Sequence, residues 1–598
     1  MKAISGKPEY SCLGVKCRGV GDFVRKTTVT LATSILLGLA TAGAVAQQSA
    51  APPMFDGYRG DRPSGWLGQT RSEVLGRNGM VATSQPLAAE AGLQILRAGG
   101  NAFDAAVATA AVLNVVEPEA AGIGGDMFVI AWSAKDKKLI ALDASGRAGS
   151  GATLQYFLDK GMKNMPRNGI GSVVVPGAVD GWDTLLKRYG SMGFDKVLDP
   201  AAKIAEDGFA VTERIAFEWS NSSKALTAEP ESTRVYLPGG KPAPLYGIFR
   251  NPDLGKSFRL LQKGGRDVFY KGEIARAIAA KSQASGGTIA LADFDKIHAQ
   301  WVQPINSSFR GYEVYQMPPS TQGFGVLEMM NILEVCPAKL GMTAAQLNPK
   351  SADYWHLMVE AKKLAYADLE IYDGDPDFSD VPVKRLVSKD YAAQQCAKID
   401  MKKAAGMAKV PEPIGGTAYL TTADRFGNVV SFIYSVYGIF GSGVTVPGYG
   451  FLLNNRAAGF SLDPKSPNVV APGKRPFYTI IPGFVTKDGK PLLSFGVMFG
   501  DQQAQGQAQV LANILAFGAN PQAAGDTARF SHSQTTNKLR METELFNAVG
   551  AELKARGHDV VQANGFGMGG YQAIMIDPGS GVYRGASDPR KDGLAIGY

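Results

Sequence analysis

The segment that begins at Pro411, PEPIGGTAYLTTADRFGNVVSFIYSVYGIFGSG, constrains the fold most strongly. Its apolar and β-branched runs predict two strands joined by a tight loop over Asp424 to Asn428. Strands so joined pair antiparallel, and a loop centred on Phe426 places Thr417 opposite Ser435 if the pair has no bulge. Further strand-like segments follow, whereas helical periodicity is common before Pro411. We therefore expect an α/β protein built as a layered sandwich.

Two glycines directly before Thr417 permit backbone geometries that other residues avoid. A strained Gly416–Thr417 bond can be attacked by the threonine hydroxyl, and hydrolysis after this N→O acyl shift frees Thr417 as a new N-terminus. Its α-amine, with a reference pKa of about 8, then serves as the general base. Ser435 is placed to hydrogen-bond and orient the Thr417 hydroxyl. The alternative is that Gly-Gly-Thr is only a turn before a hairpin.

Several other signatures are missing from the sequence. There is no G-x-S-x-G, H-E-x-x-H or G-x-x-x-x-G-K-[ST] motif. The four histidines and four cysteines show no metal-ligand spacing, so we expect no metal and no cofactor. Cys336 and Cys396 can form one disulfide or remain two free thiols.

The N-terminal region predicts export. Arg25 and Lys26 precede an apolar run that ends in an A-x-A site at Ala46, which is typical of a secretory signal over residues 1–46. An uncleaved membrane anchor is the alternative. Residues 1–46 hold six of the 62 basic and two of the 54 acidic residues, which leaves a net charge of +4. This mild charge does not imply nucleic-acid binding.

Residues 47–79 are rich in Pro, Gly and Gln in their first part and predict an extended arm, with organised structure from about Met80. Ser84 is the expected cap of a helix with Pro86 in its first turn. Gly99 and Gly100 end that helix, and a second, Ala-rich helix is expected over 103–115. A long amphipathic helix is expected over 354–372.

Six blocks, in order, give the chain a specific resemblance. They are VATSQPLAAEAGLQILRAGGNAFDAAVA, VVEPEAAGIGGDMF, VPGAVDGW, PPSTQGFGVLEMMNIL, HLMVEAKKLAYAD and GDPDF. Over about 80–598 the chain resembles the γ-glutamyltransferase family of N-terminal-nucleophile hydrolases. The resemblance implies a four-layer αββα sandwich and a proenzyme cut between Gly416 and Thr417. Residues 80–416 then form the large chain and 417–598 the small chain.

The resemblance also implies site residues. Ser435 falls where the family places a Thr that hydrogen-bonds the nucleophile. The oxyanion pair falls on Phe499 and Gly500, and one backbone N–H remains at each position. The Ser-Ser pair that helps to bind a carboxylate is replaced by Tyr478 and Thr479.

Other substrate-binding positions depart from the family pattern. Its carboxylate-binding Arg is absent from its usual place, and Arg147 lies two positions further on, where it binds an anionic substrate or is a surface residue. The positions that recognise a glutamyl amino group hold Tyr437, Arg456 and Gly459. A fixed positive charge at Arg456 repels an ammonium group.

These departures resemble the branch that includes oxamate amidohydrolase and cephalosporin acylases. We expect a self-processing, exported amidohydrolase of periplasmic or secreted location, acting through an acyl-Thr417 intermediate. Its substrate is either a γ-glutamyl amide such as glutathione or a small non-glutamyl amide. Its expected partners are that substrate and its own two chains, without nucleic acid or membrane after signal removal. A non-catalytic binding relative is the alternative from another class.

Overall fold

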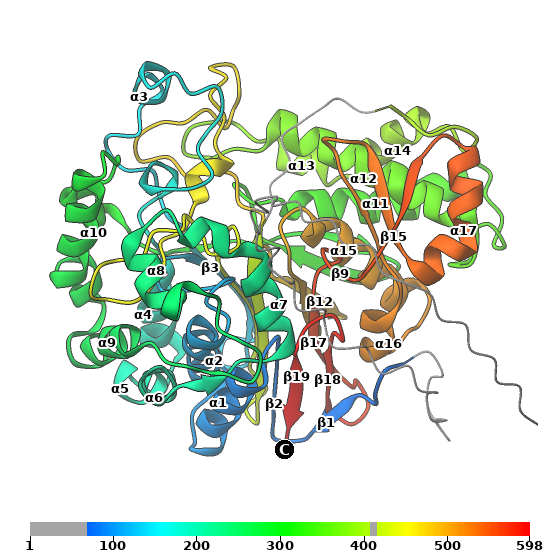
Figure 1. Ribbon diagram of the computed structural model, residues 1–598. Helices are drawn as coiled ribbons and strands as arrows, with labels where there is room; N and C mark the ends of the chain where they lie inside the picture. The colour runs from blue at the N-terminus through cyan, green and yellow to red at the C-terminus, as the bar shows by residue number, and fades with distance from the viewer. Residues whose placement is uncertain (1–68, 407–414) are drawn as a thin grey trace, which may run out of the picture. The chain divides into compact units, whose positions relative to one another are not determined.

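Two antiparallel sheets packed face to face, with helices on both outer faces, form the four layers of the protein (Figure 1). The computed structural model describes residues 69–406 and 415–598. The predicted signal peptide and residues 47–68 of the predicted arm lie outside the described residues. The fold class expected from the sequence, an αββα sandwich of the N-terminal-nucleophile hydrolase type, is confirmed.

The first sheet has the strand order β19-β2-β10-β11-β3-β4-β7, and all neighbours in it run antiparallel. Its strands are β2 (Gly79–Thr83), β3 (Asp126–Ser133), β4 (Lys138–Ala144), β7 (Gln300–Val302), β10 (Gly416–Asp424), β11 (Val429–Tyr437) and β19 (Leu594–Gly597). The predicted hairpin, β10–β11, therefore lies at the centre of this sheet.

The second sheet has the order β1-β18-β17-β13-β12-β9-β8 and is also antiparallel. Its strands are β1 (Val74–Gly76), β8 (Ile305–Phe309), β9 (Tyr312–Gln316), β12 (Gly483–Lys487), β13 (Lys490–Val497), β17 (Tyr571–Ile576) and β18 (Tyr583–Ser587). Two smaller sheets are formed by β5 (Phe209–Ala210) with β6 (Ile248–Phe249), and by β14 (Phe530–His532), β15 (Lys538–Glu542) and β16 (Asp559–Ala563).

Alternation of side chains along the strands explains the layers. In β3, Val129 points to the helices that cover the first sheet, whereas Phe128 and Ile130 point into the space between the sheets. Tyr419 of β10 and Phe484 of β12 meet these residues in the same inter-sheet core. Both faces of the central strands β3, β10 and β11 are buried, so these strands carry apolar residues on both sides.

The helices divide into two groups by the core that they cover. Those over the first sheet are α1 (Pro86–Arg97), α2 (Ala102–Val116), α4 (Ala178–Tyr189), α5 (Phe194–Val197), α6 (Asp199–Asp207), α7 (Glu213–Ser222), α8 (Pro230–Tyr236), α9 (Pro252–Tyr270) and α10 (Glu273–Ala284). Those over the second are α11 (Gly323–Lys339), α12 (Ala352–Tyr372), α13 (Val383–Leu386), α14 (Lys389–Gln395), α15 (Gln502–Leu511), α16 (Pro521–Asp526) and α17 (Thr543–Ala555). Helix α3 (Leu154–Asp159) contributes Phe157 to a small separate core.

Both parts of the chain expected from the cleavage point contribute strands to both sheets. The first sheet takes β10, β11 and β19 from residues 417–598, and β2 lies between two of them. The second sheet takes β12, β13, β17 and β18 from the same part. A cut at Gly416–Thr417 therefore leaves two chains that share both sheets and the inter-sheet core.

Local differences from the sequence expectations have simple causes. Gln85, and not Ser84, caps α1, because its side chain accepts a hydrogen bond from Leu87 N, while the Ser84 hydroxyl donates to Glu117. Ordered pairing starts before Met80, since β1 pairs with β18. Helix α12 matches its expected range within two residues.

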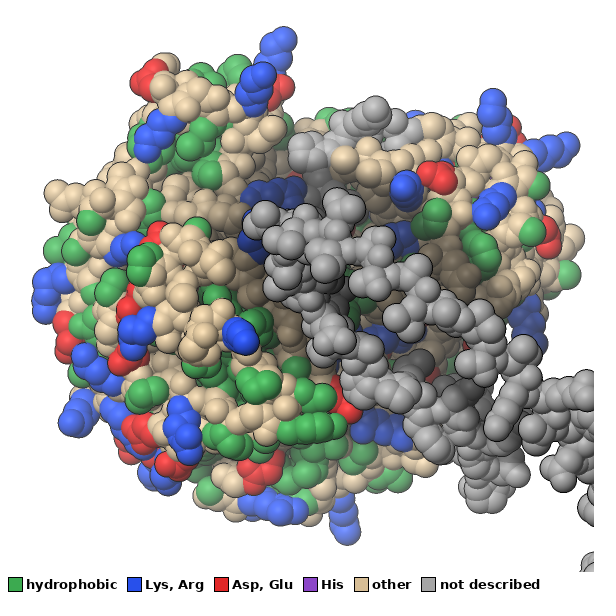
Figure 2. Space-filling model, viewed as in Figure 1, with side chains coloured by type: hydrophobic (Ala, Val, Ile, Leu, Met, Phe, Trp, Pro, Cys, Tyr) green, Lys and Arg blue, Asp and Glu red, His purple; other side chains and the backbone are tan. Residues whose placement is uncertain are grey.

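Cys336 and Cys396 form a disulfide that joins α11 to the segment after α14, which resolves the alternatives that the sequence left open. No helix of the described residues is both long and apolar enough to span a membrane. On the face shown in Figure 2, basic and acidic side chains are interspersed over the described part of the molecule.

Candidate active site

Thr417 is the second residue of β10 and lies at an irregularity in the hairpin. The pairing runs in the predicted register as far as Ala418 opposite Tyr434, and then shifts so that Gly416 lies opposite Tyr437. Ser435 and Val436 therefore both oppose Thr417, which is the arrangement of a β-bulge. The sequence prediction placed Ser435 alone opposite Thr417 and assumed no bulge; that assumption was wrong, because the bulge sets Val436 there as well.

The bulge changes the partner of Ser435. Its hydroxyl donates to the carbonyl oxygen of Gly416 at 2.7 Å and accepts from Tyr437 N at 2.7 Å, rather than contacting the Thr417 hydroxyl as predicted. The carbonyl that it contacts belongs to the peptide bond before Thr417. A hydroxyl donor on this oxygen stabilises negative charge that develops there during attack on the carbon.

Gln503, on the first turn of α15, contacts the Thr417 hydroxyl. Its Nε2 donates to Thr417 Oγ1 at 3.2 Å, and its Oε1 accepts from Ile481 N at 3.1 Å. Thr417 is 3% exposed and Gln503 is fully buried. Hydrogen bonds at both its oxygen and its nitrogen fix the Gln503 amide. Gln503, and not Ser435 as predicted, therefore orients the Thr417 hydroxyl.

Gly415 packs directly against the turn that carries Phe499 and Gly500. A Cβ on Gly415 would lie 3.2 Å from Gly500 N and 3.1 Å from the Tyr437 carbonyl oxygen. Phe499 and Tyr437 both have positive φ, of 87° and 81°. Such backbone is strained for residues other than glycine and tends to occur at functional sites.

Arg456 lies in the short 3-10 helix η6 (Arg456–Gly459) and is fully buried. Its Nε donates to Asp126 Oδ2 at 3.0 Å, and its guanidinium lies 4.8 Å from the ring centres of both Tyr437 and Tyr478. Neither Nη1 nor Nη2 has a hydrogen-bond partner among residues 69–406 and 415–598. Buried guanidinium nitrogens without partners are costly, and they indicate a place for a ligand or water.

Asp126 connects this arginine to the hairpin, because β3 pairs Asp126 with Ser435. Its Oδ1 accepts from Gly146 N at 2.7 Å. Burial raises the pKa of Asp126 to about 6, although Arg456 opposes the shift. The carboxylate still carries its charge at neutral pH and balances one fixed positive charge.

The remaining predicted positions after Thr417 are Tyr478, Thr479 and Gly459. The Tyr478 hydroxyl donates to the Gly146 carbonyl at 3.0 Å. The Thr479 carbonyl and the Gly500 carbonyl both accept from Gln322 Nε2, which ties the two segments together. A side chain at Gly459 would meet the Phe477 carbonyl at 2.7 Å, so this position leaves no room for an acidic residue.

Arg147 is engaged in an ion-pair network. Its Nη1 donates to the Gly473 carbonyl at 2.9 Å, and its Nη2 donates to Asp377 at 3.0 Å. Asp375 lies 3.8 Å from Nη1. The sequence suggested either an anion-binding or a surface arginine, and the structure instead assigns this guanidinium to pairs with two aspartates.

Comparison with known proteins identifies the family of the chain. The family model described as Gamma-glutamyltranspeptidase matches residues 88–598. The chain belongs to the gamma-glutamyltranspeptidase family. This confirms the resemblance seen in the six sequence blocks and the expectation of an enzyme of the N-terminal-nucleophile hydrolase type.

Individual members of the gamma-glutamyltranspeptidase family match over nearly their whole length. The Glutathione hydrolase-like YwrD proenzyme of Bacillus subtilis (strain 168) is 37% identical over 88% of this chain and 99% of its own. The Oxamate amidohydrolase proenzyme of Klebsiella pneumoniae subsp. pneumoniae is 33% identical over 88% of this chain and 100% of its own. The cephalosporin acylase structure from Bacillus halodurans has a TM-score of 0.83 at 38% identity, covering 91% of this chain and 99% of that one.

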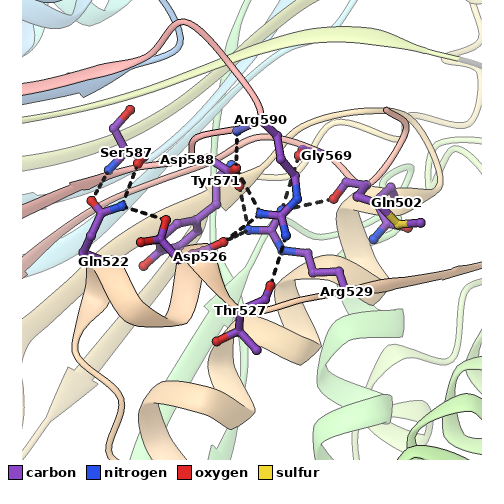
Figure 3. Close-up of polar contacts among 12 residues, drawn as sticks. Gln502, Gln522, Asp526, Thr527, Arg529, Gly569, Tyr571, Ser587, Asp588 and Arg590 are labelled. Carbon is purple, nitrogen blue, oxygen red and sulfur yellow. Dashed lines mark hydrogen bonds and ion pairs between the residues drawn. The ribbon is translucent and has the colours of Figure 1, made fainter. Parts of the chain in front are cut away.

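A polar network that includes Arg529, Gly569 and Gln502 (Figure 3) contacts residues next to the Phe499–Gly500 turn. Met498 N donates to the Gly570 carbonyl, and Arg529 Nη1 donates to the neighbouring Gly569 carbonyl at 3.3 Å. Gln502, at the start of α15, donates to the Phe530 carbonyl at 3.0 Å. These contacts hold the segments on both sides of the turn in the sequence, Met498 before it and Gln502 after it.

The sequence did not single out Gln503 or Asp126 as functional residues. Gln503 follows the Phe499–Gly500 turn by three residues, so the helical stretch QQAQGQAQV after that turn was the available signal. Asp126 ends the block GIGGD, and its pairing with Ser435 depends on the β11–β3 register. A single sequence does not specify that register.

Proposed function

We propose that the chain is a self-processing amidohydrolase whose nucleophile is Thr417. The observation that carries the proposal is the pair of donors at the scissile bond: Ser435 to the Gly416 carbonyl and Gln503 to Thr417 Oγ1. Oγ1 attacks the Gly416 carbonyl carbon, the bond from this carbon to the Thr417 nitrogen breaks, and the nitrogen takes up the proton from Oγ1, which converts the amide into an ester. Water then hydrolyses the ester, which gives a Gly416 carboxylate and a free Thr417 amine.

In the cleaved enzyme the same atoms act on a substrate amide. The free amine accepts the Oγ1 proton, Oγ1 attacks the carbonyl carbon, and the amine half leaves with a proton. The acyl group remains as an ester on Thr417 until water, or an amine acceptor, takes it. Gly500 N–H is the proposed oxyanion donor, because it lies against the space that Gly415 occupies before cleavage.

Gly415 and Gly416 occupy the space that we propose for the acyl group of the substrate once the chain is cleaved. A Cβ built on Gly416 would lie 3.0 Å from the Glu119 carbonyl oxygen, 3.3 Å from Ala120 Cα and 3.4 Å from Ile439 Cα, and one built on Gly415 would lie 3.1 Å from Gly500 Cα. After cleavage, a substrate acyl group takes this space next to Thr417. Tyr437, whose ring packs against Arg456, pairs with Gly416 and therefore borders the same space.

Arg456 favours an acyl group that carries an anionic or carbonyl oxygen and lacks an ammonium group. The relatives named glutathione hydrolase make a γ-glutamyl amide the second candidate substrate. An ammonium group near Arg456 is repelled, whereas a carboxylate can accept from two guanidinium nitrogens at once. We therefore place the function nearer to the acylases and oxamate amidohydrolase than to glutathione hydrolysis.

Two substrates that differ only in the ammonium group test the function. Glutaryl-4-nitroanilide has the acyl skeleton of γ-glutamyl-4-nitroanilide without the α-amino group, and both release the same chromophore. The expected result is a kcat/KM at least tenfold higher for the glutaryl compound. A preference of tenfold or more for the γ-glutamyl compound would falsify the assignment, and turnover of neither, nor of oxamate, would favour the non-catalytic alternative.

The proposed location is outside the cytoplasm, periplasmic or secreted. Export is supported by the signal-like sequence of residues 1–46 and by the Cys336–Cys396 disulfide, since disulfides persist mainly in oxidising compartments. The proposed mature enzyme consists of a large and a small chain from one precursor. Cell fractionation of the natural host, with the protein in the cytosolic fraction, would contradict this location.

A further inference from the structure

Three buried side chains outside the proposed active site bring metal-binding atoms together. His356 and Glu360 lie on α12, and His558 lies just before β16. One ligand atom from each residue lies within 4.8 Å of the other two. The three residues are between 0% and 5% exposed. They come from both sides of the proposed cleavage point, because α12 precedes Thr417 and β16 follows it.

The geometry of the cluster follows from the helix. His356 and Glu360 are four residues apart, so their side chains lie on the same face of α12. His558 faces them, with its Nε2 at 2.8 Å from His356 Nδ1 and at 3.9 Å from Glu360 Oε1. Two imidazole nitrogens and a carboxylate oxygen form the ligand set of many zinc sites that keep an open fourth position.

Neighbouring groups orient these ligands. The Asp400 carbonyl can only accept, so His356 Nε2, at 2.9 Å, carries the proton and leaves the Nδ1 lone pair facing His558. Ala405 N donates to Glu360 Oε2 at 3.2 Å. Metal-binding histidines commonly donate their other nitrogen to a carbonyl in this way.

We propose that His356, Glu360 and His558 bind one zinc-class divalent cation, with water as the fourth ligand. Zinc–nitrogen bonds of about 2.0–2.1 Å separate tetrahedral ligands by roughly 3.4 Å. The two histidine nitrogens therefore move apart by roughly half an ångström, and the His558 proton moves to Nδ1. The ion then replaces the hydrogen bond between the rings.

The positive charge of Lys363 is in direct contact with this site and opposes cation binding. Its Nζ donates to Glu360 Oε1 at 2.8 Å and to the Ala405 carbonyl at 2.9 Å. A carboxylate offers about four lone-pair sites, and Lys363 and Ala405 N use two of them, so Glu360 keeps acceptor capacity toward His558. The ammonium charge weakens binding, and we expect a Kd of about 1 µM, far weaker than that of a four-ligand structural zinc site.

An ion at this place links the two parts of the chain. Asp400 and Ala405 contact the cluster through their backbones and lie in the last described stretch before the cleavage point. Coordination therefore ties α12, residues 400–405 and the entry to β16 together. The site depends on the folded chain alone and not on the activity proposed for Thr417.

Zinc titration of the purified full chain, after dialysis against a chelator, tests the site. We expect one ion per chain by calorimetry, a higher Tm with zinc, and tetrahedral visible absorption bands when cobalt(II) replaces zinc. His558→Gln is expected to weaken zinc binding at least 100-fold. His532→Gln is the matched control, because His532 is equally buried but bonds to Lys362 and Asn537; it should change the Kd less than threefold.

Glu360→Gln provides a second test of the site in case His558→Gln does not fold. Glu360→Gln retains an acceptor for Lys363 but loses the ligand charge, and we expect at least tenfold weaker zinc binding. The proposal is overturned if the chelator-treated wild type binds no zinc below 100 µM. It is equally overturned if His558→Gln or Glu360→Gln binds zinc as tightly as the wild type does.

Discussion

Two buried arginine–aspartate pairs, Arg529–Asp588 and Arg456–Asp126, look alike by burial and differ in how their hydrogen bonds are satisfied. In both, the side chains are at most 2% exposed. Arg529 donates from its two Nη atoms to three backbone carbonyls and to Asp588 (Figure 3). Arg456 donates only from Nε, and within the described part of the chain its Nη atoms have no partner.

The aspartates show the same contrast. Asp588 contacts Arg529 and Arg590 and accepts from two backbone N–H groups, and the two guanidinium groups hold its pKa below the usual value against the effect of burial. Asp126 has one arginine, and burial raises its pKa to about 6. Arg529 leaves only Nε without a partner in the described part of the chain, and its pair with Asp588 fixes structure. Arg456 leaves both Nη atoms without one, and its pair beside Thr417 keeps donors for a ligand.

Removing each guanidinium should separate the two pairs most clearly. Arg529→Met removes a guanidinium that donates to Asp588 and to three backbone carbonyls, and leaves Asp588 with Arg590 and two backbone N–H donors. We expect a loss of about 3 kcal/mol in the free energy of unfolding. Arg456→Met should cost only about 1–2 kcal/mol. The pKa of Asp126 is already raised by burial, so without Arg456 the carboxylate takes up a proton and leaves no buried charge. Urea unfolding at pH 7 measures both, with Arg188→Met as control for an arginine stacked between two rings. Equal losses in the free energy of unfolding would show that the two pairs contribute equally to stability, against this prediction.

The pH dependence of stability should have opposite signs at the two aspartates. Asp126 has a raised folded pKa, so its contribution is present below the unfolded value and is lost as pH rises through about 6. That loss is about 3 kcal/mol at most. Asp588 has a lowered pKa, so its contribution is present above the unfolded value and is lost as pH falls.

Thermal unfolding between pH 3.5 and pH 7 measures this difference in Asp126→Asn and Asp588→Asn. Relative to wild type, Asp126→Asn should gain in Tm as pH rises, and Asp588→Asn should lose. Curves that shift in the same direction would show that the two carboxylates have similar environments.

The ligand role of Arg456 should appear as a change of specificity. Arg456→Gln removes a charge-assisted contact of about 2 kcal/mol, so kcat/KM for glutaryl-4-nitroanilide should fall about 30-fold. The value for γ-glutamyl-4-nitroanilide should stay within threefold or rise, because the repulsive charge is gone. A parallel fall for both substrates would indicate a structural arginine like Arg529.

A smaller effect is expected at Gln503. Gln503→Leu removes one neutral hydrogen bond to Thr417 Oγ1, and kcat should fall by up to about tenfold with little change in KM. Gln509→Leu is the control, since Gln509 is buried on the same helix but bonds to Gln505 and Phe530. An equal fall in kcat for Gln509→Leu would assign the Gln503 effect to the helix as a whole.

Much of the fold followed from local sequence patterns. The hairpin loop was predicted at Asp424–Asn428, and there Asp424 Oδ1 accepts from the backbone N–H groups of Phe426 and Asn428. Such short-range hydrogen bonds depend only on neighbouring residues. The ends of α1 and α2 were predicted within about one residue for the same reason.

Features that depend on distant contacts were not predictable. The bulge opposite Thr417 lies where the Ser435 hydroxyl donates to the Gly416 carbonyl and Tyr437 takes a positive φ. Arg456 meets Asp126 across 330 positions, and His356 meets His558 across 202. Pairings of this kind are set by the stacking of the sheets and helices, and one sequence carries no local signal for them.

The central claim is that the chain frees Thr417 as an N-terminal nucleophile. Intact-mass measurement of the purified protein under denaturing conditions, with N-terminal sequencing, tests it most directly. The account predicts two chains, the smaller beginning Thr417-Ala418-Tyr419, in the wild type and in the control Thr421→Ala, and a single chain in Thr417→Ala. A single uncut chain in the wild type, or a smaller chain that begins at any other residue, would contradict it.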